Sequence, residues 1–436
     1  MINKLRQKSS LNETSSIFKG MLTLLKGAGL ARLIGIVSIP ILARIYTPED
    51  YGILALYVSF VTILMPIMTL RYVQAIPLPR MDVVAFNLFS LCSKLIVFFS
   101  VLLGILLYIW GGQLLAWFNM EALMPWRWLI VIGAAGAATY ELFSLWATRK
   151  KQYQIIAKTQ VTQSFIGNLV KIGLGLLAFK SSGMIIGQFI SQSAGIVSFI
   201  KNARQDFKAY LPKVQKNKEK FVAKYYQDFV WFRLPSQFLL SLTSQAPVMM
   251  MAALYSKEAT GQLSLAMMAI ALPVGLIGGA ISKAYYAEIA AMGKRDISRI
   301  RLITLAVQKR LFLIGIPITI LIMVLAKPLF VLIFGEQWAL AGVYATILSP
   351  YILLQFTSNP LIQILNIIGS QLTFLVINII RILGLVLIYI WFNYNLLDEI
   401  KFIYLLSAYL FLYYFAMTFF VLYLLRVAVN FKDRVS

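Results

Sequence analysis

Long apolar stretches, each about the length of a membrane span, recur along the chain from Gly20 to Arg426. A helix that crosses about 30 Å of hydrocarbon needs roughly 20 apolar residues, because each residue rises about 1.5 Å. Twelve stretches meet this requirement, and most connections between them are short. We therefore expect an all-α polytopic membrane protein with about 12 transmembrane helices. The predicted spans are 20–42, 52–70, 87–110, 128–146, 159–179, 183–200, 234–254, 263–282, 311–334, 341–363, 371–392 and 402–425.

The polar interruptions in this pattern divide the chain into two sets of six spans. The longest interruption, Lys201 to Arg233, is basic and too short to form a water-soluble domain. We predict an N-terminal six-helix bundle at 1–200, a basic cytoplasmic linker at 201–233 and a C-terminal six-helix bundle at 234–436. The polar and basic N-terminus is interpreted as an uncleaved cytoplasmic tail, because the apolar run after it lacks the small-residue cleavage pattern of a signal peptide.

A short motif recurs at the same place in both sets of spans. YTPEDYGILAL begins at Tyr46 and YSKEATGQLSL begins at Tyr255, and both read Y-x-x-E-x-x-G-x-L-x-L. Each copy joins the first and second spans of its own set. Since two sets of six spans have the same orientation in the membrane, the repeat predicts two bundles related by a pseudo-twofold axis along the membrane normal. The space between two such bundles is the expected substrate route.

Charge then orients the spans and narrows the partners. The net charge is +24, but 29 of the 40 Lys and Arg residues fall in the tails and in the connections on one side of the membrane. The positive-inside rule places these segments, and both termini, in the cytoplasm. Basic clusters such as KVQKNKEKFVAK are expected to lie against anionic membrane lipids rather than nucleic acid. The opposite side carries only Arg44, Arg127, Lys180, Lys257 and Lys401 in its connections, and Lys327 in the outer half of the ninth span.

Five further cations lie inside the predicted spans, where charge is costly. An insertion cost of about 2.5–3.5 kcal/mol applies to a cation at the bilayer centre, so these side chains are expected to face water or a partner rather than lipid. A single acid, Glu141 in the fourth span, is available to neutralise them. The surplus of positive charge predicts an anionic substrate, and Arg suits a phosphate or carboxylate especially well. The candidate substrate-binding cations are Arg32, Arg381, Lys26, Lys94 and Lys171.

Several of these charged residues have an alternative role besides substrate binding. Lys94 is close enough to the cytoplasmic edge for its stem to snorkel, and Lys171 is able to reach the outer interface or to pair with Glu141. Glu141 itself is either a proton or cation carrier or a structural partner for Lys94 or Lys171. On an ideal helix Lys26 and Arg32 lie about 120° apart, so a shared face requires a bend at a nearby glycine.

Uncharged polar side chains add a second set of candidates. Gln245 in the seventh span and Gln355 and Asn359 in the tenth are expected either to bind sugar hydroxyls or to hydrogen-bond neighbouring helices. The chain has one cysteine, Cys92, and no histidine, so no metal site and no cofactor is predicted. No phosphate-binding loop follows a strand, and no catalytic constellation is present, so we do not expect an enzyme.

The segment PILARIYTPEDYG, which begins at Pro40, resembles the first-turn signature of Wzx-type O-antigen and polysaccharide flippases. These proteins form the polysaccharide transporter family of the MATE-like multidrug/oligosaccharidyl-lipid/polysaccharide superfamily. Other segments that look like family segments are LWATRKKQYQIIAKTQ, GAISKAYYAEIA, LFVLIFGEQWALAGVYATILSPYILLQFTSNPLIQILNIIG and the central arginine of INIIRILGLV. Arg32 also falls where the related lipid II flippases carry an arginine. The chain departs from the family at Val73 and Glu141.

This resemblance implies a flippase of the bacterial inner membrane that works by alternating access. Its substrate would be a polyprenyl (undecaprenyl) pyrophosphate-linked oligosaccharide, moved to the periplasmic leaflet for O-antigen or a related surface polysaccharide. The diphosphate would meet Arg32, Lys26 and Arg381, and other polysaccharide assembly proteins are expected partners. Two alternatives are a cation-coupled multidrug exporter of the same fold and a membrane glycan polymerase or ligase. The first should place acids in its cavity and the second should have a large external loop, so both fit less well.

Overall fold

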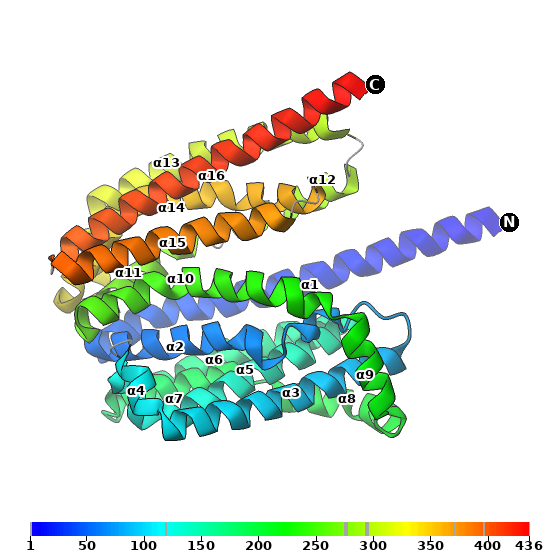
Figure 1. Ribbon diagram of the computed structural model, residues 1–436, viewed down its shortest axis with the longest axis horizontal. Coiled ribbons are helices and arrows are strands. Elements are labelled where there is room, and N and C mark those ends of the chain that lie inside the picture. Colours follow the sequence, from blue (N-terminus) through cyan, green and yellow to red (C-terminus); the bar gives the residue numbers. More distant parts are fainter. Residues whose placement is uncertain are drawn as a thin grey trace. The chain divides into compact units, whose positions relative to one another are not determined.

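The computed structural model describes residues 2–117, 120–273, 278–292, 296–368, 371–395 and 397–435. Most of this part of the chain is helical, and within each of its two compact units long helices run side by side (Figure 1). They are α1 (Ile2–Ile45), α2 (Pro48–Met68), α3 (Asp82–Ile109), α4 (Gly111–Ala116), α5 (Arg127–Arg149), α6 (Tyr153–Leu176), α7 (Lys180–Ser193), α8 (Ile196–Tyr210), α9 (Lys216–Tyr225), α10 (Leu234–Leu254), α11 (Lys257–Pro273), α12 (Gly279–Met292), α13 (Ile297–Phe334), α14 (Ala339–Ile368), α15 (Gln371–Asn395) and α16 (Glu399–Val435).

The all-α membrane architecture expected from the sequence is confirmed. Within the described residues, ten helical segments are long and apolar enough to cross a membrane, and they correspond to ten of the twelve predicted spans. The fifth prediction, 159–179, lies in α6, which is helical but less apolar because it carries residues such as Gln160, Gln163 and Lys171. The eighth prediction, 263–282, covers parts of α11 and α12 and includes residues 274–277, which lie outside the described residues.

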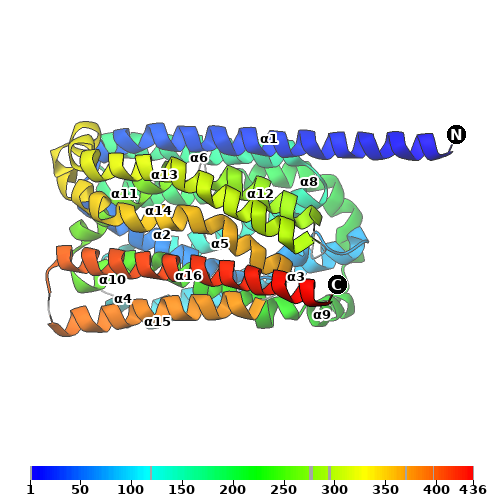
Figure 2. The same ribbon diagram turned by 90° about the horizontal axis from the view of Figure 1, so that it is seen from above.

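Two boundaries differ from the expectation. The sixth predicted span, 183–200, is interrupted between α7 and α8, because Gly195 has a φ of +97° that ends one helix before the next begins. Glycine adopts this left-handed conformation readily because it lacks a Cβ. At the N-terminus, α1 begins at Ile2 and continues without interruption to Ile45, so the segment interpreted as a polar tail is the start of the first helix (Figure 2).

The chain forms two compact units, of which the first comprises Met1–Tyr46 and Leu56–Phe238. In this unit α5 packs against α3, α6, α7 and α8, and α1 packs along α6. Gly27 permits the close approach of α1, because a Cβ there would meet Ala157 of α6 at 2.5 Å. The short basic helix α9 packs on α3 and runs across its end rather than along it (Figure 1).

The second unit comprises Thr47–Ala55 and Leu239–Ser436. Its central helix is α14, which packs against α11, α12, α13, α15 and α16. Ser407 of α16 donates to the carbonyl of Ile347 at 2.7 Å, and Ser358 bonds with Thr418 at 2.6 Å, so buried hydroxyls join α14 to α16 at two levels. Interhelical bonds of this kind are favoured in lipid, because water is not available as a competing partner.

The repeated motif has the same local structure in both copies. Tyr46 donates to the carbonyl of Lys171 in α6, and Tyr255 donates to the carbonyl of Leu397 just after α15, at 2.7 and 2.8 Å. Tyr46 therefore ties the end of the first helix of its set to the fifth helix, and Tyr255 ties the end of the first helix of its set to the connection that follows the fifth helix. Loss of hydration raises the pKa of Tyr255 to about 12, so its hydroxyl stays protonated and remains a donor.

The two motif glycines contact each other's helix within the second unit. A Cβ on Gly52 would overlap the carbonyl oxygen of Lys257, and a Cβ on Gly261 would overlap the carbonyl oxygen of Pro48. Pro48 and Lys257 occupy equivalent places, each two residues after its motif tyrosine. The first turns of α2 and α11 thus meet in a reciprocal contact, as two copies of one unit do around a local twofold axis.

Candidate functional site

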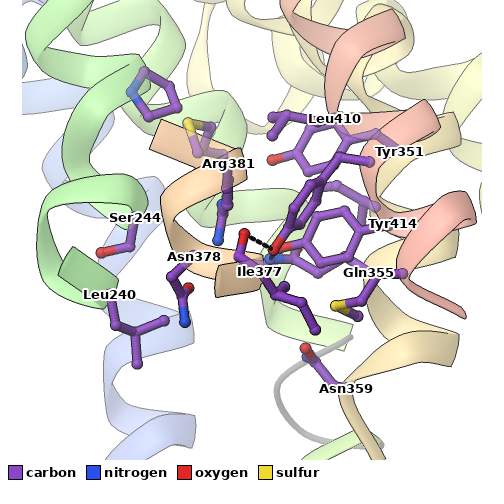
Figure 3. A pocket seen from close by; sticks show the side chains of 16 residues that line it. Leu240, Ser244, Tyr351, Gln355, Asn359, Ile377, Asn378, Arg381, Leu410 and Tyr414 are labelled. Atoms are coloured by element: carbon purple, nitrogen blue, oxygen red, sulfur yellow. Dashed lines mark hydrogen bonds between the residues drawn. The ribbon is translucent and has the colours of Figure 1, made fainter. Parts of the chain in front are cut away.

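A polar and aromatic pocket of about 300 Å³ lies inside the second unit, within the membrane-spanning helices. Residues of α10, α11, α14, α15 and α16 line it, and Figure 3 shows labelled side chains of α10, α14, α15 and α16 around one space. Arg381 of α15 is the only charged residue among the 16 described residues that line this pocket, and none of those residues is acidic. The pocket therefore carries a net positive charge.

Neighbouring aromatic rings fix the position of Arg381. The guanidinium carbon lies 5.5 Å from the ring centre of Tyr414 and 5.7 Å from that of Tyr413, both on α16. Cation–π contacts of this kind hold a guanidinium without neutralising it. Gly384 lets α16 come this close, because a Cβ there would overlap Tyr409, whose hydroxyl donates to the Arg381 carbonyl at 3.1 Å.

Arg381 still has a hydrogen-bond donor to offer. Its Nε is buried and has no hydrogen-bond partner within the described residues. A buried donor without a partner costs about 1–3 kcal/mol, so it is rare unless a ligand or water satisfies it. The guanidinium is thus held in place by rings and has an unused donor, which is a suitable arrangement for binding an anion.

Two of the predicted amide side chains line the same pocket. Gln355 donates to the hydroxyl of Tyr414 at 2.9 Å, and Asn359 lies one turn further along α14 and is exposed. Ser244 of α10 also lines the pocket, whereas the adjacent Gln245 does not. The structure therefore brings Arg381, Gln355 and Asn359 together in one site.

Sequence reasoning missed the aromatic and amide residues that complete this pocket. They are Tyr351, Tyr413, Tyr414 and Asn378. Asn378 is three residues before Arg381, so helical spacing places both on one side of α15 and was a usable signal. The tyrosines gave no such signal, because aromatic residues are common throughout apolar spans and their pairing with Arg381 depends on how α15 and α16 pack.

The predicted cations of α1 belong to the first unit. Arg32 and Lys26 are both exposed, and the α1 surface that faces α6 is marked instead by Gly27 and by Ala31, whose carbonyl accepts from Ser164 at 2.7 Å. Because α1 continues as one helix through its glycines, the spacing of Arg32 and Lys26 stays near that of an ideal helix (Figure 2).

Lys94 has a partner that the sequence analysis did not consider. Its Nζ lies 2.6 Å from a carboxylate oxygen of Glu219 on α9, and the Glu219 side chain is only 8% exposed. The Lys94 side chain is 62% exposed. In this conformation the pair joins α3 to α9, so part of the positive charge of Lys94 is neutralised within the chain.

Lys171 and Glu141 do not pair with each other. Lys171 is buried between α6 and α7, where its Nζ donates to Gln188 at 2.7 Å. Glu141 lies 3.3 Å from Nη1 of Arg71, a residue of the connection that follows the second predicted span. The expected partners of Glu141, Lys94 and Lys171, are thus replaced by Arg71, whose left-handed backbone (φ 60°) turns it toward α5.

Comparison with protein families gave one match. The model of a family described as "Polysaccharide biosynthesis protein" matches residues 41–343. This range includes the first copy of the repeated motif, the second copy and the first part of α14. A comparison with curated protein sequences gave no match.

Solved structures with the same fold are membrane transporters. The lipid II flippase MurJ in an inward closed conformation is 15% identical, with a TM-score of 0.66 over 94% of this chain and 93% of that chain. An inward-facing multidrug resistance MATE transporter is 14% identical, with a TM-score of 0.61 over 94% and 95%. A MOP superfamily transporter from Pyrococcus furiosus, described as having a binding pocket of reverse polarity, is 12% identical, with a TM-score of 0.55 over 95% and 96%.

Proposed function

Because the chain belongs to the polysaccharide biosynthesis protein family, and its fold is that of the MOP superfamily transporters, we propose that it is a lipid-linked oligosaccharide flippase. The substrate is a polyprenyl pyrophosphate-linked oligosaccharide, which moves from the cytoplasmic to the periplasmic leaflet of the bacterial inner membrane. The oligosaccharide is then used for O-antigen or a related surface polysaccharide. Both termini lie in the cytoplasm.

The observation that carries this proposal is the environment of Arg381. A cation inside a membrane span, held by two tyrosine rings and with an unpaired Nε, lacks a counter-ion among the described residues that line its pocket. A visiting anion would supply that counter-ion. A pyrophosphate group suits the site, because its oxygens accept several hydrogen bonds from one guanidinium.

The other cations have unequal parts in this proposal. Arg32 and Lys26 are exposed on the first helix and are assigned to early contact with the diphosphate. Lys94 and Lys171 already have partners in this conformation, so they would join the substrate route only after a rearrangement that releases Glu219 or Gln188. The amides of Gln355 and Asn359 are assigned to the sugar next to the diphosphate, while Gln245 is assigned to helix packing.

A multidrug exporter of the same fold is the second candidate. A pocket that binds cationic drugs needs carboxylates to pair with them. The described lining of the Arg381 pocket contains none, and Glu141 is already paired with Arg71. The charge of the pocket therefore favours an anionic substrate over a cationic drug.

The function is tested by deleting the gene and analysing the surface polysaccharide together with the lipid-linked intermediates. We expect the surface polysaccharide to be lost and its lipid-linked precursor to accumulate, and the intact gene on a plasmid to restore both. Normal surface polysaccharide without accumulation, in a strain that lacks other flippases, would contradict the proposal. A strain that instead becomes sensitive to cationic drugs would favour the exporter.

A further inference from the structure

A second cavity, of about 500 Å³, lies between α15 and α16 in the same unit. Its walls come from one face of each helix, at spacings of three or four residues. On α15 these include Val376 and Ile380, and on α16 they include Ala416 and Phe420. All four side chains are exposed, so in a membrane the cavity opens sideways to the lipid chains. We call this cavity the lateral groove.

The walls of the lateral groove are almost entirely apolar. Among the described residues that line the groove, two have a polar side chain. One is Tyr413, whose hydroxyl donates to the carbonyl of Ile377 at 3.3 Å. The other is Thr373, which is not without an interaction partner either. No charged residue lies among the described residues that line the groove, so its chemistry suits a hydrocarbon chain.

The lateral groove and the Arg381 pocket share one wall. Ile377, Tyr413 and Met417 line both cavities. The guanidinium carbon of Arg381 lies 5.7 Å from the ring centre of Tyr413, and Tyr413 also lines the groove. On α15, Ile380 of the groove directly precedes Arg381 of the pocket, and successive residues on a helix point about 100° apart. An anion in the pocket and a hydrocarbon chain in the groove would therefore lie on adjacent faces of α15.

The geometry points to one amphiphilic molecule that occupies both cavities. We propose that the lateral groove binds the part of an isoprenoid chain that lies next to the pyrophosphate held at Arg381. This inference rests on the proposed function for the nature of the anion. It adds a binding site for the lipid part of the substrate, made by the last two helices of the second unit.

Shape, rather than the hydrophobic effect, must select the chain. Bilayer lipid is as apolar as the groove, so moving a chain from one to the other gains little from removal of water. Selectivity then comes from dispersion contacts with a well-fitting wall. An isoprenoid chain carries regularly spaced methyl branches, and a lining that combines the small side chain of Ala416 with the larger Val376 and Phe420 is uneven enough to suit such a chain. A straight acyl chain would fill this wall less completely.

The test measures ligand binding to the full chain in phosphatidylcholine nanodiscs. The probes are farnesyl pyrophosphate, dodecyl pyrophosphate, inorganic pyrophosphate and farnesol. Ala416→Trp fills the groove from an exposed position, and Leu405→Trp on the same helix is the matched control, because Leu405 is exposed and lies outside the groove. Arg381→Ala removes the cation of the pocket.

We expect Ala416→Trp to weaken farnesyl pyrophosphate binding about tenfold, because the indole displaces a small part of the dispersion contacts that the whole chain makes. Inorganic pyrophosphate binding should stay unchanged. Leu405→Trp should change neither. Arg381→Ala should weaken the binding of all three pyrophosphate compounds and leave farnesol binding unaffected. An Ala416→Trp protein that binds farnesyl pyrophosphate like the wild type would overturn the inference. Equal losses for the farnesyl and dodecyl compounds would also overturn it, because the groove would then accept ordinary lipid chains.

The same measurements separate this inference from the proposed function. Wild-type protein that binds no pyrophosphate but still binds farnesol, with a loss in Ala416→Trp, would contradict the anion site while supporting the groove. Protein that binds inorganic pyrophosphate through Arg381, with no difference between Ala416→Trp and Leu405→Trp for any chain, would support the anion site and contradict the groove.

Discussion

At the scale of single residues, four of the charges inside the predicted spans fall into two groups. Arg381 is held by tyrosine rings, and its Nε lacks a hydrogen-bond partner among the described residues. Lys94, Lys171 and Glu141 have polar partners on neighbouring helices. Breaking a buried pair usually costs more than the pair contributes, because the remaining charge is left without a partner. The two groups are therefore expected to respond differently to substitution.

Lys94 provides a test that separates a structural role from substrate binding. Lys94→Met leaves the buried carboxylate of Glu219 alone, and we expect α9 to dock less firmly on α3, by about 1 kcal/mol for a pair with one exposed partner. Protease cleavage between α8 and α10 should then become faster. Lys218→Met, on the exposed side of α9, should leave cleavage unchanged.

The double variant Lys94→Met/Glu219→Gln decides the role of the pair. If Lys94 is structural, the double variant should regain both protease resistance and polysaccharide export. If the double variant regains protease resistance but not export, Lys94 contacts the substrate.

Glu141 is expected to act mainly through Arg71. Arg71 is 8% exposed, so Glu141→Gln leaves its charge without a counter-ion and should destabilise the protein, by up to about 3–5 kcal/mol for a fully buried pair. A lower midpoint of thermal unfolding in detergent would show this, and adding Arg71→Gln should recover part of the loss. Export by Glu141→Gln that keeps its dependence on pH or sodium would exclude this carboxylate as the coupling group.

At the scale of helices, the repeated motif explains how α2 and α11 begin. Sequence comparison of the two halves found Gly52 and Gly261 in equivalent positions, and the structure shows that each glycine lies against the backbone of the other helix. The contact is between backbones, so it demands glycine in both copies. This explains why both copies of the motif have glycine at this position, while the residues directly before and after it differ.

We expect Gly52→Ala to destabilise the second unit, although alanine normally stabilises a helix by up to about 1 kcal/mol over glycine. The added Cβ overlaps the carbonyl of Lys257, and overpacking of this kind costs about 1–3 kcal/mol. The midpoint of thermal unfolding should fall. Gly173→Ala in α6 is the control, because a Cβ there meets nothing within 4 Å, and its midpoint should stay the same or rise. Unchanged stability of Gly52→Ala would mean that α2 and α11 separate readily.

Hydropathy located most helices because length and apolar content are properties of single segments. It failed where one residue or one partner decides the outcome. The break at Gly195 depends on a single backbone conformation, and the polar helix α6 is stabilised by neighbours that hydropathy does not consider. The pairing of Arg71 with Glu141 likewise depends on a left-handed turn after α2, which an apolar pattern does not record.

At the scale of the whole molecule, the site could be predicted only in part. A cation inside an apolar span can be recognised from the sequence, because any charge in the bilayer carries an insertion cost whatever the fold around it. This reasoning identified Arg381. The sequence does not show which cations already have partners, since those partners come from distant segments such as α9. Nor does it show the tyrosines of α16 or the lateral groove, because both arise from the way α15 and α16 pack.

In the proposed function, a cationic site inside the membrane receives the pyrophosphate of the substrate. The most direct measurement is surface polysaccharide in the deletion strain carrying Arg381→Ala, Arg381→Lys or Arg32→Ala, with each protein quantified in the membrane. We predict that both alanine variants accumulate normally but lose most export, and that Arg381→Lys keeps part of it because charge is retained without the two-pronged geometry. Full export by both alanine variants would contradict the account.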